Sequence, residues 1–249
     1  MKSLLILFLF IGYSLSLQAE NSFPDVSAKA PFSIGETVEF ASDVLKEKRR
    51  LNIYLPASYT KEKERQYPVI YLLDGSKEED FIHIAGLVQF GSFSWINMMP
   101  ESIVVGIANV DRKRDFTFPT NNKKDKEDFP TTGSSARFID YLAKEVQPLI
   151  KSSYRITGEQ TLLGQSLGGL LATEVFYRQP NLFDNYVIVS PSLWWDDESL
   201  LAEELAHKDF KGQVFVAVGK EGPLMERVAR QLFGKIENGV SERAQIAFK

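Results

Sequence analysis

Residues 164–168 read Gly-Gln-Ser-Leu-Gly, a serine with a glycine two positions away on either side. This spacing is typical of a sharp turn from a strand into a helix, where larger side chains beside the serine would clash. The turn lifts the hydroxyl of Ser166 above the end of a sheet and places it at a helix N-terminus, whose free N–H groups stabilise an oxyanion. The pattern therefore predicts a serine that attacks a carbonyl carbon.

Two backbone N–H groups should stabilise the oxyanion that such an attack creates. One is expected from Leu167, the residue after the nucleophile. The other is expected in the loop after the apolar run 69–73, at Gly75 or Ser76. Each such donor typically contributes about 3 kcal/mol of transition-state stabilisation.

The acid and the base of a serine triad on this kind of turn follow the nucleophile, in that order. The acid is expected after the strand 214–218, where Glu221 stands. Glu226, one turn further on, and Asp196, after the preceding strand, are the alternatives.

The base is harder to find, because the chain has 2 histidines. His83 precedes Ser166 and His207 precedes Glu221, so we expect both to be structural. A base in the expected order would follow the last strand, and therefore lie beyond Lys249. We expect a C-terminally incomplete chain that is nearly inactive as numbered, because a serine without a base is a poor nucleophile.

Candidate substrate-binding residues also follow predicted strands. Trp194 and Trp195 come after the strand 186–189, where pockets form in open α/β sheets, and their rings could stack on an aromatic acyl group. Arg112 and Arg114 follow another strand and could hold an anionic or polyphenolic substrate. The chain has 0 cysteines, which excludes a cysteine-based zinc site. We expect no metal and no cofactor.

The elements that must position these residues alternate between buried strands and helices. Two β-rich stretches at 37–44 and 50–55 suggest a hairpin, and the polar segment 111–133 is either a functional loop or a surface insert. Repeated βα units with apolar strands predict a doubly wound, mostly parallel α/β sheet. The expected strands are 69–73, 102–108, 161–163, 186–189, 214–218 and 244–248, and the expected helices are 80–90, 134–150, 167–178, 198–207 and 224–237.

Composition limits the class of protein. The 249 residues carry 29 Lys and Arg against 33 Asp and Glu, a net charge of −4 that argues against nucleic acid as a partner. Lys2 followed by the apolar run 4–17 predicts a secretory signal peptide over residues 1–19, and thus a periplasmic or secreted protein. Residues 20–249 are expected to form a single domain without stable membrane insertion.

Four segments together resemble a known family. They are YPVIYLLDG (67–75), SIVVGIANVDRKRDFTFPT (102–120), LLGQSLGGLLATEVFYRQPNLF (162–183) and SPSLWWDD (190–197). Together they resemble the putative esterase family of α/β-hydrolases, which contains esterase D, periplasmic siderophore esterases, feruloyl esterases and secreted mycolyltransferases. The LLDG loop and the SPSLWW segment place the chain nearest the siderophore-esterase branch.

The resemblance implies an α/β-hydrolase fold and a serine carboxylic-ester hydrolase that acts on a small-molecule ester, of siderophore or other aromatic type. Two alternatives stay open: an acyltransferase on the same fold, or a non-catalytic binding module that lacks the base. The sequence does not specify the ester or the oligomeric state.

Overall fold

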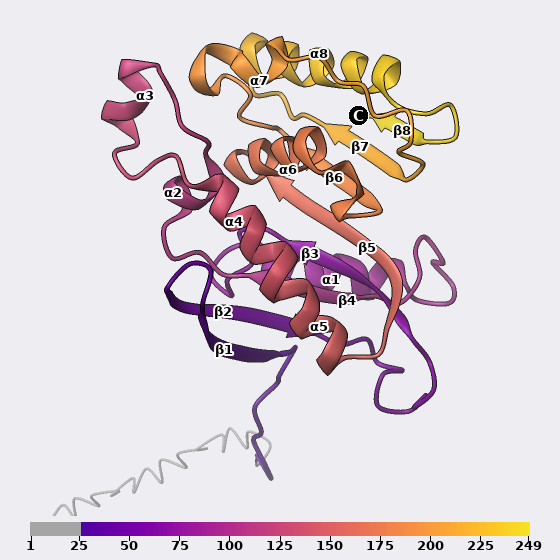
Figure 1. The fold of residues 1–249 in the computed structure, drawn as a ribbon. Coiled ribbons are helices and arrows are strands. Elements are labelled where there is room, and N and C mark those ends of the chain that lie inside the picture. Colours follow the sequence, from indigo (N-terminus) through magenta and orange to yellow (C-terminus); the bar gives the residue numbers. More distant parts are fainter. Residues whose placement is uncertain (1–25) are drawn as a thin grey trace, which may run out of the picture. The chain divides into compact units, whose positions relative to one another are not determined.

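The computed structural model describes residues 26–249, and all the strands and helices described below lie within residues 33–249 (Figure 1). The signal peptide expected over residues 1–19 lies outside the described residues. No helix within 26–249 is long and apolar enough to cross a membrane.

Eight strands form one sheet in the order β1-β2-β4-β3-β5-β6-β7-β8. The first two strands form the expected hairpin, and β2 pairs antiparallel with β4. From β4 to β8 all neighbours are parallel, so their carboxyl ends meet at one edge of the sheet. The predicted α/β-hydrolase fold with a mostly parallel sheet is confirmed. The strands are β1 (Glu36–Ser42), β2 (Glu47–Tyr54), β3 (Tyr67–Leu72), β4 (Ile103–Ile107), β5 (Ile156–Gln165), β6 (Asn185–Val189), β7 (Gln213–Ala217) and β8 (Gln245–Phe248).

The helices cover the two faces of this sheet unequally. Apolar side chains of α4, α6 and α8 form the main core on one face, whereas α1 packs against β3 and β4 on the other. A π-helical turn at residues 142–146 joins α4 to α5 into one long helical rod (Figure 1). The helices are α1 (Phe81–Gly91), α2 (Arg112–Phe116), α3 (Lys123–Asp128), α4 (Ser135–Tyr141), α5 (Gln147–Ser153), α6 (Leu167–Arg178), α7 (Ser199–Ala202) and α8 (Pro223–Gly239).

The α1 side of β5 to β8 carries an open apolar groove of about 750 Å³. Strand residues Leu163, Val187 and Phe215 line its floor, and Leu87 of α1 and Met98 line its wall. Leu87, Met98 and Phe215 are 51%, 79% and 37% exposed. Strands of a parallel sheet are normally buried on both faces, so this uncovered area is unusual for the fold.

Three sequence predictions differ from the structure. Strand β5 begins at Ile156 and not, as expected, at residue 161. Its first half is polar and so carries no apolar signal in the sequence, but it pairs with β3. The helix expected over 198–207 is wrong: α7 has 4 residues, and His207 instead forms an isolated parallel bridge with Val240. The segment 111–133, expected to be a functional loop or a surface insert, contains the short helices α2 and α3.

Candidate active site

Ser166 lies at the junction of β5 and α6, as the Gly-x-Ser-x-Gly pattern predicts. Its backbone has φ 55° and ψ −119°, a sparsely populated conformation for a residue with a side chain. The N–H of Ser166 donates to the carbonyl of Val189 on β6 at 3.0 Å. The surrounding structure thus holds a strained turn that presents the hydroxyl at the carboxyl edge of the sheet.

The glycines of the motif are needed because the turn brings two backbones into contact. A Cβ on Gly164 would lie 2.2 Å from the carbonyl oxygen of Gly168. A Cβ on Gly168 would lie 3.3 Å from the Cβ of Leu73, in the loop after β3. The motif therefore reflects close packing between the strand, the helix and the neighbouring loop.

One expected oxyanion donor fits the structure and the other does not. Leu167 is the first residue of α6, so its N–H has no acceptor within the helix. The N–H of Gly75, however, donates to the carbonyl of Ile107 at 3.0 Å, and that of Ser76 donates to Glu79 at 3.2 Å. The prediction of Gly75 or Ser76 is wrong, because the first is hydrogen-bonded to the end of β4 and the second to an acidic side chain.

Asp74, the next residue of this loop, also lies against the elbow. One of its carboxylate oxygens lies 3.3 Å from the position that a Cβ on Gly168 would take. Its backbone has φ 55°, and within residues 26–249 its N–H donates to no acceptor. Sequence reasoning missed this residue because glycine is the usual choice at such a turn; the LLDG pattern itself contains the signal.

Arg112 lies between this loop and the elbow. Its guanidinium donates to both carboxylate oxygens of Asp74, at 2.6 and 2.8 Å, and more weakly to the carbonyl of Gln165 at 3.4 Å. Burial alone would lower the pKa of Arg112, but the hydrogen bonds and charge of Asp74 outweigh it and raise the pKa. A permanent positive charge therefore stands beside the residue that precedes the nucleophile.

Glu221 follows β7 at the same edge of the sheet as Ser166, two strands away. The hydroxyl of Ser190, which follows β6, donates to its carboxylate. The position agrees with the order expected of a triad acid.

The two alternative acids are placed differently. Asp196 accepts from the hydroxyl of Thr120 at 2.9 Å and from the N–H of Asn121 at 2.6 Å. Burial would raise the pKa of Asp196, but these hydrogen bonds outweigh it and lower the pKa. Asp196 therefore anchors the loop before α3. Glu226 lies in the first turn of α8, and within 26–249 its carboxylate makes no hydrogen bond.

Neither histidine contacts Ser166. The ring of His207 hydrogen-bonds the carbonyl of Tyr177, eleven residues along α6 from the nucleophile and so about 16 Å away. His83 is exposed on the first turn of α1. Among residues 26–249, the side-chain partner of the Ser166 hydroxyl is the hydroxyl of Ser192, at 3.3 Å.

The two tryptophans have different environments. Trp195 is fully buried, and its indole N–H donates to the carbonyl of Phe118 at 3.0 Å. Its predicted role in stacking on a substrate is therefore wrong, because the ring packs in the core. Trp194 is half-buried, with its ring centroid 5.9 Å from that of Phe129. It remains a candidate binding residue.

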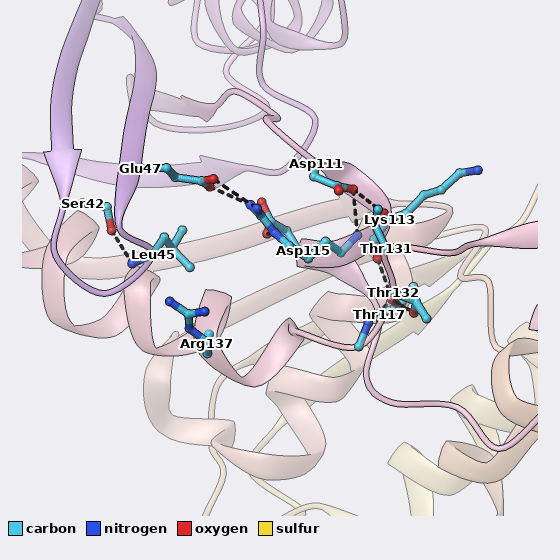
Figure 2. A network of polar contacts seen from close by, with 12 residues as sticks. Ser42, Leu45, Glu47, Asp111, Lys113, Asp115, Thr117, Thr131, Thr132 and Arg137 are labelled. Carbon is cyan, nitrogen blue, oxygen red and sulfur yellow. Dashed lines mark hydrogen bonds and ion pairs between the residues drawn. The ribbon is translucent and has the colours of Figure 1, made fainter. Parts of the chain in front are cut away.

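Arg114 is not at the elbow. Its guanidinium pairs with Asp115 at 2.7 Å and with Glu47 of β2 at 2.6 Å. Figure 2 labels both of these acidic residues. Strand β2 lies three positions from β5, or about 14 Å. The prediction that Arg114 binds substrate is wrong, because its pairing with Glu47 holds the guanidinium at β2, away from the elbow.

Residues 42–249 match the model of a family described as putative esterases. The chain belongs to this family. The match covers every candidate site residue, from Asp74 to Glu221.

Individual relatives agree with the family match. The ferri-bacillibactin esterase BesA of Bacillus subtilis is 30% identical over 168 residues, 62% of this chain and 58% of that protein. The chain thus aligns with less than two thirds of this relative. An IroE-like serine hydrolase of Shewanella oneidensis is 30% identical with a TM-score of 0.73, over 86% of this chain and 73% of that one. A BES protein of Bacillus cereus is 25% identical with a TM-score of 0.75, over 92% and 90%.

Proposed function

We propose that this chain is a serine carboxylic-ester hydrolase that forms an acyl-enzyme on Ser166. The observation that carries the proposal is the strained backbone of Ser166 at the start of α6, which turns its hydroxyl to the edge where Glu221 also lies. Membership of an esterase family supports the reaction class.

The reaction begins when the Ser166 oxygen attacks the ester carbonyl and its proton passes to a general base. The N–H groups of Leu167 and Asp74 donate to the oxyanion that forms. When the intermediate collapses, the alcohol leaves with the proton from the base. Water then attacks the acyl-enzyme by the same route, releasing the acid and restoring Ser166.

The general base lies outside residues 26–249 in this proposal, in a segment that follows β8. Two observations support it. Neither histidine within 26–249 hydrogen-bonds Ser166, whose hydroxyl pairs with that of Ser192, and the apolar groove over β5 to β8 lacks the layer that a parallel sheet requires. Val218 donates to the carbonyl of Lys249 at 3.1 Å, so a segment leaving Lys249 would start at the edge where Glu221 lies.

The substrate class is a siderophore-type or other aromatic ester. Arg112 supplies a fixed positive charge beside the elbow, which suits an anionic or catecholate oxygen. Trp194 offers a half-buried aromatic ring on the next loop. The relative BesA, whose name describes a ferri-bacillibactin esterase, supports this class. Secretion through the signal peptide of residues 1–19 would place the protein in the periplasm or outside the cell.

A fluorophosphonate probe tests the nucleophile directly. In a chain extended past Lys249, we expect covalent labelling at Ser166, identified by mass spectrometry of the labelled peptide, and none in its Ser166→Ala variant. The same extended chain should hydrolyse short p-nitrophenyl esters. Labelling that persists unchanged in Ser166→Ala would overturn the proposal.

Two other outcomes would indicate a different function. Acyl transfer to an added alcohol, with little hydrolysis, would indicate an acyltransferase. Tight binding of an aromatic ester without labelling or turnover, in the extended chain as well, would indicate a binding module.

A further inference from the structure

The segment Ser190–Pro191–Ser192 lies between the candidate nucleophile and the candidate acid. Ser190 and Ser192 are 2% and 3% exposed. Buried hydroxyls need partners inside the protein, because water does not reach them. Here the partners are the two residues on which the proposed reaction depends.

Ser192 holds Ser166 by both backbone and side chain. Its N–H donates to the carbonyl of Ser166 at 3.0 Å, and the two hydroxyl oxygens are 3.3 Å apart. Leu170 donates to the same carbonyl at 2.9 Å, which completes its hydrogen bonding. Ser192 thus restrains both the strained backbone of Ser166 and the direction of its hydroxyl.

Ser190 holds the carboxylate of Glu221. Its N–H donates to Ala217 on β7 at 2.7 Å, and its hydroxyl donates to one oxygen of Glu221 while accepting from Gly219 at 3.4 Å. With its donor and an acceptor site both used, the hydroxyl is confined to one orientation. The second oxygen of Glu221 makes no hydrogen bond within residues 26–249.

The segment has little room to move. A Cβ on Gly169 of α6 would lie 2.9 Å from the carbonyl oxygen of Val189 and 3.0 Å from the Cα of Pro191. The first turn of the nucleophile's helix therefore packs directly on the segment, and the proline ring fixes one further dihedral angle. A shift of this backbone would displace both partners.

We propose that Ser192 and Ser190 are positioning residues for Ser166 and Glu221, so that one rigid segment sets nucleophile and acid together. The inference rests on the proposed function, because positioning has meaning only if Ser166 reacts. Ser192 fixes the direction from which the Ser166 oxygen meets the ester carbonyl. Ser190 keeps one carboxylate oxygen of Glu221 available to orient a base.

The first experiment measures the rate of fluorophosphonate labelling in variants of the chain extended past Lys249. Ser192→Ala should slow labelling about fivefold, the size of one ordinary hydrogen bond, and Ser192→Thr should restore most of the rate. Ser152→Ala is the control, since Ser152 is exposed and donates to Leu149 at the end of α5. In the extended, ester-hydrolysing form, Ser192→Ala should lower kcat and leave KM unchanged.

The second experiment is a double-mutant cycle on the acid side. Ser190→Ala and Glu221→Gln should each slow turnover of the extended form, and the double variant should be no slower than the slower single variant. Additive effects would show that the two residues act separately, and would overturn the coupling.

A crystal structure of Ser192→Ala gives a readout that needs no activity. We expect the Ser166 side chain to occupy more than one rotamer. A single unchanged rotamer, or a wild-type labelling rate in Ser192→Ala, would overturn the inference. The proposed function fails separately, through labelling that survives in Ser166→Ala.

Discussion

The two flanks of Ser166 are built from different interactions. On the β3 and β4 side, Asp74 and Arg112 form a two-point ion pair at 2.6 and 2.8 Å. On the β6 and β7 side, Ser190 and Ser192 make hydrogen bonds between hydroxyls, backbone and a single carboxylate. One flank is held by opposite charges and the other by largely neutral groups.

The difference follows from what each flank must leave free. The ion pair occupies both carboxylate oxygens of Asp74, so its contribution to the site is a backbone N–H and the positive charge of Arg112. On the other flank, Glu221 is held through one oxygen. A carboxylate that an arginine holds at both oxygens keeps fewer lone pairs for orienting a base. The charged flank therefore suits oxyanion stabilisation and the hydroxyl flank suits proton transfer.

The largest expected effect comes from forcing β5 and α6 apart at the elbow, which lies between the two flanks. Gly164→Ala would place a Cβ 2.2 Å from the carbonyl oxygen of Gly168, so strand and helix must separate. We expect labelling of Ser166 to fall by about 10³-fold and the free energy of unfolding by about 1–3 kcal/mol. Gly158→Ala on the same strand is the control, because nothing lies within 4 Å of its Cβ position.

Urea unfolding and labelling kinetics would check this prediction. If Gly164→Ala labels as fast as Gly158→Ala, the close approach of strand and helix does not create the reactive turn.

A smaller effect is expected from breaking the charged flank alone. Arg112→Ala leaves the carboxylate of Asp74, whose side chain is 10% exposed, with Asn109 as its remaining side-chain partner at 2.6 Å. We expect labelling and ester turnover to fall about 30-fold, because the loop carrying the Asp74 N–H loosens. Arg112→Lys keeps the charge without the two-point geometry and should recover only part of the rate.

Arg50→Ala is the matched control for that comparison. Arg50 pairs with Glu39 at 2.6 Å in an exposed position on the hairpin, and its loss should leave steady-state rates unchanged. Equal rates for Arg112→Ala and Arg50→Ala would contradict a role for the charged flank.

The smallest effect on the site is expected from Glu174, further along α6. Burial raises the pKa of Glu174 to about 7, although the charge of Arg178 lowers it in part. A carboxyl group whose pKa is higher in the folded than in the unfolded state favours folding most when it is protonated. Its stabilising effect is therefore complete below the unfolded value near 4.5 and is lost as the pH rises through about 7.

We therefore expect the wild-type chain to lose up to about 3 kcal/mol of stability between pH 4.5 and 8 through this group. Glu174→Gln should flatten that part of the curve and leave labelling of Ser166 at pH 7 unchanged. Thermal unfolding across this pH range checks the first statement. If the pH dependence of unfolding is the same in Glu174→Gln as in the wild type, groups other than Glu174 cause it.

Much of the fold can be predicted from the sequence. The buried strands at the centre of the sheet and helix 167–178 are evident, because apolar periodicity is set by local burial. The region 198–207 cannot be predicted correctly, since its apolar pattern is overridden by pairing: the N–H of His207 donates to Gly239 at 2.8 Å, a residue 32 positions away. Strand β5 is longer than its apolar pattern predicts, because main-chain pairing, and not side-chain burial, defines its first half.

The site likewise has features that the sequence predicts and features that only the tertiary structure decides. By itself the sequence determined the candidate nucleophile's turn, its helix N-terminus and the order of strands that brings Glu221 to the same edge, because these follow from local spacing and chain order. Only the tertiary structure decided which neighbours have free groups. Gly75 and Arg114 matched the expected chemistry, but Ile107 binds the N–H of the first and Glu47 the charge of the second. Those partners are distant in sequence, and a donor or a charge is available to a substrate only when folding has not already satisfied it.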